Sequence, residues 1–210
     1  MRHRAWSMAS VLLALAVAGC GGPGQTLTMA FDIDAVPAPA KVQQALRVTV
    51  VPFEDVRPDK TSIGRYRHYV ETTVDTLVPA QGSAADQITR FVAAYLRRAG
   101  FQVSLVKAGE TVPEGSADVV LTGQIESYWN EAVGRFFRTE LTSQNRLVIK
   151  ISNAADASTV RSTVAGSGSR TAVFFDLPDL ERLNSEALGE ALSRLLGEVA
   201  VVNRTLKPKQ

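Results

Sequence analysis

The chain has 210 residues, of which 23 are basic, 21 are acidic and 45% are hydrophobic. Two of the basic residues, Arg2 and Arg4, lie in an N-terminal segment typical of an export signal, and without them 21 basic residues balance 21 acidic ones. This balance gives no electrostatic reason to expect nucleic-acid binding. The remaining chain of about 190 residues suits one folded domain with one core.

The first 19 residues show the three parts of a secretory signal. A basic start at residues 2–4 precedes an uncharged apolar run, which ends in the small residues Ala18 and Gly19. The apolar run is shorter than the roughly 20 residues that a membrane-spanning helix needs. We therefore expect residues 1–19 to be removed on export and to take no part in the fold.

Cys20 follows these small residues directly and is the only cysteine of the chain. Small residues before a cysteine resemble the lipobox of bacterial lipoprotein signals. The resemblance implies cleavage after Gly19, lipid on the Cys20 thiol and acylation of the new N-terminus, which together anchor a protein stably. Gly21 stands where an aspartate would indicate retention in the inner membrane, so we expect the periplasmic face of the outer membrane. The alternative is an ordinary signal followed by a chance cysteine.

Residues 20–45 contain glycines and prolines that are typical of a tether, and residues 46–210 are expected to form a single periplasmic domain. Residues 27–33 alternate in polarity, and a strand there would shorten the tether.

The first half of the domain predicts a strand, a helix and a strand. Residues 46–53 are apolar on both faces, which favours a central strand, and residues 68–78 alternate as a strand does. Residues 83–99 form the best helix, with Ser83 and Asp86 as a capping box and one apolar stripe. A strand at residues 101–106 would complete a right-handed crossover.

The second half predicts an antiparallel meander of strands at residues 117–129, 140–153 and 158–169, with turns at residues 130–134 and 153–157. A second helix is expected at residues 177–206, with its apolar stripe on the sheet or in a coiled-coil seam. The fold class is thus α/β (α+β). We expect two layers, with two helices on a mixed, mostly antiparallel sheet of about five to six strands.

Catalytic residue sets are not recognisable in the chain. Beyond the signal His68 is the only histidine, and no thiol remains once Cys20 carries lipid. A Ser-His-Asp or Cys-His triad would have to use His68, for which a partly exposed histidine of a strand or loop is favoured. The glycine-rich residues 166–170 lack a Walker lysine and favour a bulge or a flexible strand end. We expect no enzymatic activity and no cofactor.

Three acidic residues, Glu54, Asp55 and Asp59, lie close together but alternate with Arg57 and Lys60. Because the basic residues reduce the local negative charge, a structural loop is favoured over a weak calcium site. No metal site is expected.

Aromatic residues flank the predicted turn after residue 129. Tyr128, Trp129, Phe136 and Phe137 are expected around the tip of this hairpin, beside Arg135 and Arg138. Aromatic residues with arginine are concentrated at protein interfaces, although aromatic residues also close the ends of cores. Trp129, Phe136 and Phe137 are therefore candidate contacts to a partner protein. Phe174 and Phe175, beside the second helix, could likewise contact a partner or close the end of the core.

Several segments together resemble envelope lipoproteins of the YajG type and, more loosely, of the CsgG and LpoB group. The resemblance spans about residues 20–165 and comprises the lipobox at Cys20 and residues 48–53, 55–59, 63–64, 96–103 and 117–125. It implies a periplasmic α/β domain of two layers and no catalytic residues.

Three functions follow as hypotheses. The first is a non-enzymatic adaptor, anchored by lipid, that binds another envelope protein or the cell-wall machinery through the aromatic hairpin or an open sheet edge. The second is an auxiliary component of a lipid or glycan export system, such as an ABC-type transporter, with a ligand groove between sheet and helix. The least favoured is a hydrolase that uses Glu126 and Glu131, because nothing in the sequence pairs these carboxylates.

Overall fold

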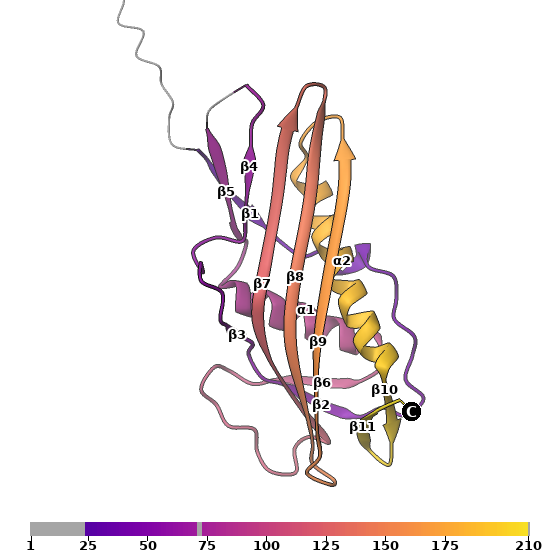
Figure 1. The fold of residues 1–210 in the computed structure, drawn as a ribbon. Coiled ribbons are helices and arrows are strands. Elements are labelled where there is room, and N and C mark those ends of the chain that lie inside the picture. Colours follow the sequence, from indigo (N-terminus) through magenta and orange to yellow (C-terminus); the bar gives the residue numbers. More distant parts are fainter. Residues whose placement is uncertain (1–23, 71–72, 210) are drawn as a thin grey trace, which may run out of the picture.

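The computed structural model describes residues 24–70 and 73–209. The predicted signal peptide and Cys20 lie outside the described residues. The described chain forms two layers, with a nine-stranded mixed sheet on one side and the helices α1 (Ala84–Arg98) and α2 (Leu177–Glu198) on the other (Figure 1). The prediction of two helices on a mixed sheet is confirmed, but the sheet has more strands than expected.

Three long strands dominate the sheet: β7 (Val119–Arg135), β8 (Arg138–Asn153) and β9 (Thr159–Ala172). They pair antiparallel in chain order, as the predicted meander requires. The turn between β7 and β8 lies at Phe136 and Phe137, and the turn predicted for residues 130–134 is wrong. Residues 130–133 stay in the sheet because they pair with neighbours on both sides.

Short strands pair in succession with the other edge of β7. They are β2 (Arg47–Val50), β3 (Glu54–Asp55) and β4 (Gly64–Arg67), and all three run parallel to β7. Strand β5 (Val74–Pro79) runs antiparallel to β4, and β6 (Gln102–Leu105) pairs parallel with β2 after the predicted crossover through α1. The parallel pairings are short, whereas the β7–β8 and β8–β9 ladders are long, so most paired residues of the described sheet are antiparallel. The sheet is thus mixed, as predicted, and the antiparallel part dominates by length.

Strand β1 (Thr26–Met29) pairs parallel with β5, so it adds a further edge to the sheet. Met29 is fully buried, and the carbonyls of Ile33 and Val36 in and after the 3-10 helix η1 (Ile33–Ala35) accept hydrogen bonds from Arg98 of α1. The stretch predicted to be a tether up to residue 45 is thus largely part of the domain. The apolar side chains of the alternating pattern at residues 27–33 pack on or within the core, which holds this segment on the domain.

Helix α1 has the predicted boundaries. The Ser83 side chain accepts a hydrogen bond from the Asp86 backbone, and the Asp86 side chain accepts one from the Ser83 backbone. Its apolar stripe is buried in the core. None of the described helices combines the length and apolar character that a membrane span requires.

Helix α2 packs on β8 and β9 through its apolar stripe, as predicted for packing on a sheet. It ends at Glu198, and β10 (Val199–Val202) and β11 (Thr205–Pro208) form a separate hairpin. The helix predicted up to residue 206 is therefore too long. The β-branched run after Glu198 favours a strand, and Asn203 and Arg204 both adopt the positive φ of a tight hairpin turn.

Candidate interaction surfaces

Exposed large apolar side chains gather at one end of the sheet. Phe136 and Phe137 form the β7–β8 turn and are 67% and 80% exposed. Phe174, in the β9–α2 connection, is 80% exposed, and Val70, in the β4–β5 connection, is 86% exposed. We call this surface the apolar end, and its members are Tyr69, Val70, Phe136, Phe137, Val173 and Phe174.

The strand directions bring these residues together. Strands β4, β7 and β9 all run toward the apolar end, so the connections that follow them lie side by side at the top of Figure 1. The rings of Tyr69 and Phe136 have centroids 6.1 Å apart, and those of Phe136 and Phe137 are 4.0 Å apart. Sequence reasoning missed Tyr69, Val70 and Val173, although large apolar residues in predicted loops were a usable signal.

Phe137 adopts a backbone conformation that is unusual for an aromatic residue. Its φ of +59° lies in the left-handed region, where glycine or asparagine is favoured in a two-residue hairpin turn. A bulky residue in that region costs stability. This turn is therefore not optimised for its own stability, which is common where an exposed side chain serves a function.

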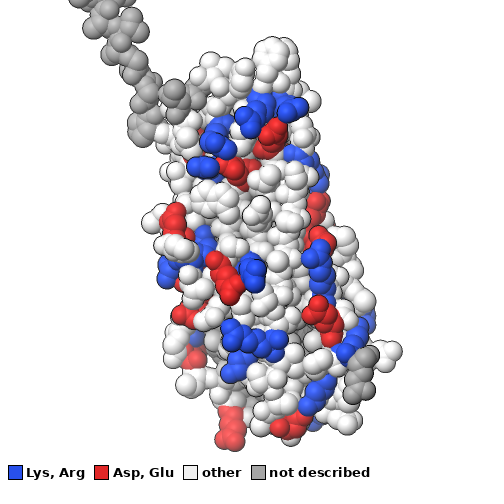
Figure 2. Space-filling view, viewed as in Figure 1, with Lys and Arg blue, Asp and Glu red and all other residues white. Residues whose placement is uncertain are grey.

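On β4 and beside the β7–β8 turn, arginines lie below the apolar end in a surplus over the carboxylates that they contact. We call them the basic collar: Arg135 and Arg138 contact Glu140 at 3.3 and 3.0 Å, and Arg65 and Arg67 contact Glu131 at 2.7 and 3.0 Å. Each set has one positive charge more than negative. The hydrogen bond from Arg135 also holds the pKa of Glu140 below its usual value, so this carboxyl stays ionised. In Figure 2 the uncharged end lies above a band with more blue than red.

Trp129 does not belong to the apolar end. It lies six residues before Arg135 on β7, so about 20 Å separate it from the turn. Its half-buried ring faces away from the helices, and the Arg65 guanidinium carbon lies 6.0 Å from the ring centroid. Of the four aromatic residues expected around the hairpin tip, only Phe136 and Phe137 are there.

Tyr128 lies on the helix side of the sheet and is buried in the core. Its hydroxyl accepts a hydrogen bond of 3.0 Å from Asn184 of α2, and burial raises its pKa. Phe175 is also a packing residue, since its ring stacks on Tyr66 with centroids 4.0 Å apart. Tyr128 is therefore not placed to contact a partner, and Phe175 packs within the domain.

The acidic loop after β2 holds a buried arginine. Asp55 accepts hydrogen bonds from Arg57 Nε and Nη2 at 2.9 and 2.8 Å, and Arg57 also donates to the carbonyls of Ser62 and Tyr128. Burial alone would raise the pKa of Asp55, but its hydrogen bonds with Arg57 and the charge of that residue lower it. Within residues 24–70 and 73–209, no three histidine, cysteine or acidic side chains form a group that suits a metal ion.

The other chemical candidates also have partners or packing roles. His68 Nε2 lies 2.9 Å from Asp75 Oδ2, and Glu126 is paired with Arg146 at 2.8 Å. The glycine-rich stretch lies within β9 and is neither a bulge nor a strand end. A Cβ on Gly166 would lie 1.9 Å from the Ala187 carbonyl oxygen of α2, so this glycine permits close packing of helix and sheet.

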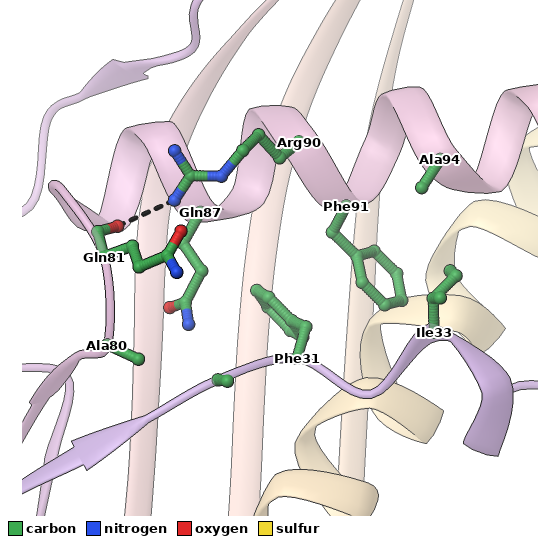
Figure 3. A pocket seen from close by; sticks show the side chains of 9 residues that line it. Phe31, Ile33, Ala80, Gln81, Gln87, Arg90, Phe91 and Ala94 are labelled. Atoms are coloured by element: carbon green, nitrogen blue, oxygen red, sulfur yellow. Dashed lines mark hydrogen bonds between the residues drawn. The ribbon is translucent and has the colours of Figure 1, made fainter.

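Two of the hollows outside the apolar end border the helices. One of about 280 Å³ separates the N-terminal segment from α1 (Figure 3). There Phe31 and Phe91 have ring centroids 4.5 Å apart, and Arg90 donates a hydrogen bond of 2.7 Å to the Gln81 carbonyl. The second, of about 500 Å³, lies among α1, α2, residues 39–43 and the β10–β11 hairpin, with Lys41 and Lys209 on its rim. Neither hollow lies between sheet and helix.

The architecture defines an α+β domain with all helices of the described chain on one face of a branched sheet. No protein-family profile and no curated protein sequence matches the chain. Among solved structures, protein XCC0632 from Xanthomonas campestris, of family DUF330, has a TM-score of 0.51 at 13% identity, with 83% of this chain and 93% of that chain covered. This likeness shows a shared fold.

Two further solved structures are more distant. The PelC dodecamer from Paraburkholderia phytofirmans has a TM-score of 0.41 at 19% identity and covers 75% of this chain and 92% of its own. Lipoprotein GNA1162 from Neisseria meningitidis has a TM-score of 0.36 at 13% identity, with coverages of 73% and 96%. Neither likeness is strong enough to inform the function of this chain.

Proposed function

We propose that the chain is a lipid-anchored, non-enzymatic accessory protein of the bacterial envelope, which binds a second envelope protein through the open face of its sheet around Trp129. The lipobox at Cys20 and the resemblance to YajG-type lipoproteins support the anchor and an outer-membrane location. The observation that carries the binding role is the position of Trp129 beside Arg65 on a face that no described helix covers.

Trp129 is the one large aromatic side chain that β7, β8 and β9 direct to this face. The surrounding face is polar, since Glu126 pairs with Arg146 and Glu131 with Arg65. Tryptophan and arginine are the residue types that most often dominate binding energy at protein interfaces, where a polar rim excludes water around them. An open sheet face with a central tryptophan therefore suits a protein partner.

The anchor is tested by replacing Cys20 with serine. If Cys20 carries the lipid, the wild-type protein fractionates with membranes, and the exported and processed Cys20→Ser protein is released. A Cys20→Ser protein that still fractionates with membranes after processing would refute the anchor.

The partner surface is tested by crosslinking in intact membranes. Trp129→Ala should abolish a crosslinked species that the wild-type protein forms, whereas Gln144→Ala should retain it. Gln144 is a matched control because it is exposed and lies directly opposite Trp129 on β8. Retention of the species in Trp129→Ala with loss in Phe136→Ala would move the contact to the hairpin turn.

A second candidate function is the binding of an apolar or glycan ligand for an export system. The hollow of about 500 Å³ favours it, because this volume is within the range of ligand sites and two lysines lie on its rim. Native mass spectrometry of the full chain, isolated from membranes, should then show a bound mass. A protein that is consistently free of ligand would exclude this role.

A further inference from the structure

We propose that the apolar end is the membrane-contacting end of the protein, so that Phe136, Phe137 and Phe174 enter the headgroup region of the leaflet that holds the Cys20 lipid. This inference rests on the proposed lipid anchor and adds to it an orientation and a second contact with the bilayer. It also assigns Phe136 and Phe137 to lipid instead of to a protein partner.

The first described residues of the chain lie close to the apolar end. Gly24, the first described residue, lies against Val74, since a Cβ on Gly24 would be 1.8 Å from the Val74 carbonyl oxygen. The Gln25 amide also donates a hydrogen bond of 2.7 Å to Asp75. Strand β1 runs parallel to β5, away from the apolar end, so the described chain begins at the side of the domain nearest that end.

Simple lengths decide which part of the domain meets the bilayer. Cys20 is four residues before Gly24, so their Cα atoms are at most about 14 Å apart. Val74 lies opposite Arg67 and Arg67 opposite Val133, and Phe136 is only three residues, or about 10 Å, beyond Val133. The lipidated cysteine and the aromatic turn can thus reach the same plane.

The opposite end of the sheet is too far away for this. From Val133 to Val119 at the start of β7, the strand extends by about 45 Å. Four residues cannot bridge that distance, so the β8–β9 turn cannot lie at the bilayer while Cys20 is inserted and the domain stands upright. If the domain lay with its sheet face on the bilayer, that polar face would contact the headgroups, and the six residues of the apolar end would remain in water.

The composition of the apolar end fits a bilayer surface. Its three phenylalanines, with Tyr69, Val70 and Val173, carry no charge, and the basic collar below them has a surplus of two positive charges in its two sets. Apolar aromatic residues that protrude beyond a ring of basic residues are typical of proteins that insert shallowly among anionic headgroups.

Depth measurements on the lipidated full chain test the proposal. Because Cys20 is the only cysteine and its thiol would carry the lipid, Phe137→Cys or Phe174→Cys gives one site for a spin label. The matched control is Ala155→Cys, which is exposed in the β8–β9 turn at the far end. Each protein is placed in vesicles of phosphatidylethanolamine with phosphatidylglycerol, and collisions with a water-soluble relaxation agent and with oxygen are compared.

We expect the labels at residues 137 and 174 to collide several-fold less often with the water-soluble agent, and more often with oxygen, than the label at residue 155. Equal accessibility at all three positions in a lipidated, vesicle-bound protein would overturn the membrane contact and leave the anchor intact. If mass spectrometry shows that the mature chain carries no lipid, the anchor fails, and this inference fails with it.

Discussion

At the scale of single residues, Phe137 combines a left-handed backbone with a side chain that is 80% exposed. Folding alone does not favour this combination, because a residue without a Cβ would relieve the steric conflict. The two roles of the position, in the turn and at the surface, can therefore be separated by substitution.

We expect Phe137→Gly to raise the free energy of unfolding by up to about 1 kcal/mol, since glycine tolerates positive φ. The same substitution should weaken contact of the apolar end with vesicles. Phe136→Gly is the control, because Phe136 is not among the residues with positive φ and glycine there should stabilise nothing. Urea unfolding measures the stability of both variants. A lower stability of Phe137→Gly than of the wild-type protein would contradict the proposal that the backbone at Phe137 is strained.

Asp118 offers a second test at this scale. A hydrogen bond from Arg47 is the main cause that lowers its pKa to about 2 from an ordinary 3.8, against the opposing effect of burial. Because the folded pKa is the lower one, the ionised carboxylate stabilises the protein above pH 3.8, and this contribution is lost as the pH falls toward 2. Asp118→Asn should cost up to about 2 kcal/mol at neutral pH, and the difference from wild type should shrink through that window.

The control for Asp118 is Asp156→Asn. Asp156 has a similarly low pKa beside Lys207, but its side chain is 40% exposed, so solvent screens the interaction and a smaller loss is expected. Urea unfolding over a pH series measures both variants. Equal losses, or a cost of Asp118→Asn that is independent of pH, would show that the ion pairs of Asp118 do not act as described.

At the scale of elements, the contact between α2 and β9 depends on a glycine. A Cβ on Gly166 would overlap the Ala187 carbonyl oxygen, a backbone atom that cannot move without shifting the helix. Overpacking of this kind typically costs about 1–3 kcal/mol. We expect Gly166→Ala to lower the free energy of unfolding by this amount in a urea titration.

Gly197, which lies in α2 itself, provides the opposite case. Nothing lies within 4 Å of the position that its Cβ would take, so Gly197→Ala should stabilise α2 by about 0.5–1 kcal/mol through helix propensity alone. If both alanine variants changed stability in the same direction, close packing would not be the reason for Gly166.

Local patterns predicted those elements whose determinants are local. The capping box at Ser83 and the apolar stripe of α1 lie within one helix, and the crossover to β6 follows from them. The β7–β8 turn was misplaced because the pairing of residues 130–133 with β4 is not visible in the nearby sequence. The end of α2 was misplaced for a similar reason, since its three-four spacing continues to Val202 while β-branched residues form a hairpin.

At the scale of the whole molecule, the apolar end joins residues from three connections that are up to about 100 positions apart in the chain. The sequence predicted Phe136 and Phe137 as contacts to a partner and left open whether Phe174 is one. It also grouped these residues with Trp129. Only the strand directions separate Trp129 from the turn and bring Tyr69 and Val173 to it. The separation yields two surfaces, and we propose a protein partner for the face around Trp129 and a bilayer for the apolar end.

The short connection between Cys20 and Gly24 should therefore control orientation. Inserting about ten Gly-Ser residues between Pro23 and Gly24 adds a root-mean-square span of about 18 Å. The protein should remain anchored, but a label at residue 137 should become more accessible to water. The same insertion between Ala155 and Asp156 is the control and should leave the label protected. Unchanged protection in both proteins would show that the short connection does not set the orientation.

The pairing of β1 with β5 has a mechanical consequence for an anchored protein. Hydrogen bonds across the strand axis join the β1 backbone to β5 and the residue after it. The Thr76 amide donates to the Gln25 carbonyl at 2.8 Å, and the Ala80 amide donates to the Met29 carbonyl at 2.9 Å. A pull on the lipid acts along the strand axis, so these bonds are loaded together in shear and are not opened one after another. The first strand thus resists tension in the direction in which a membrane would pull on it.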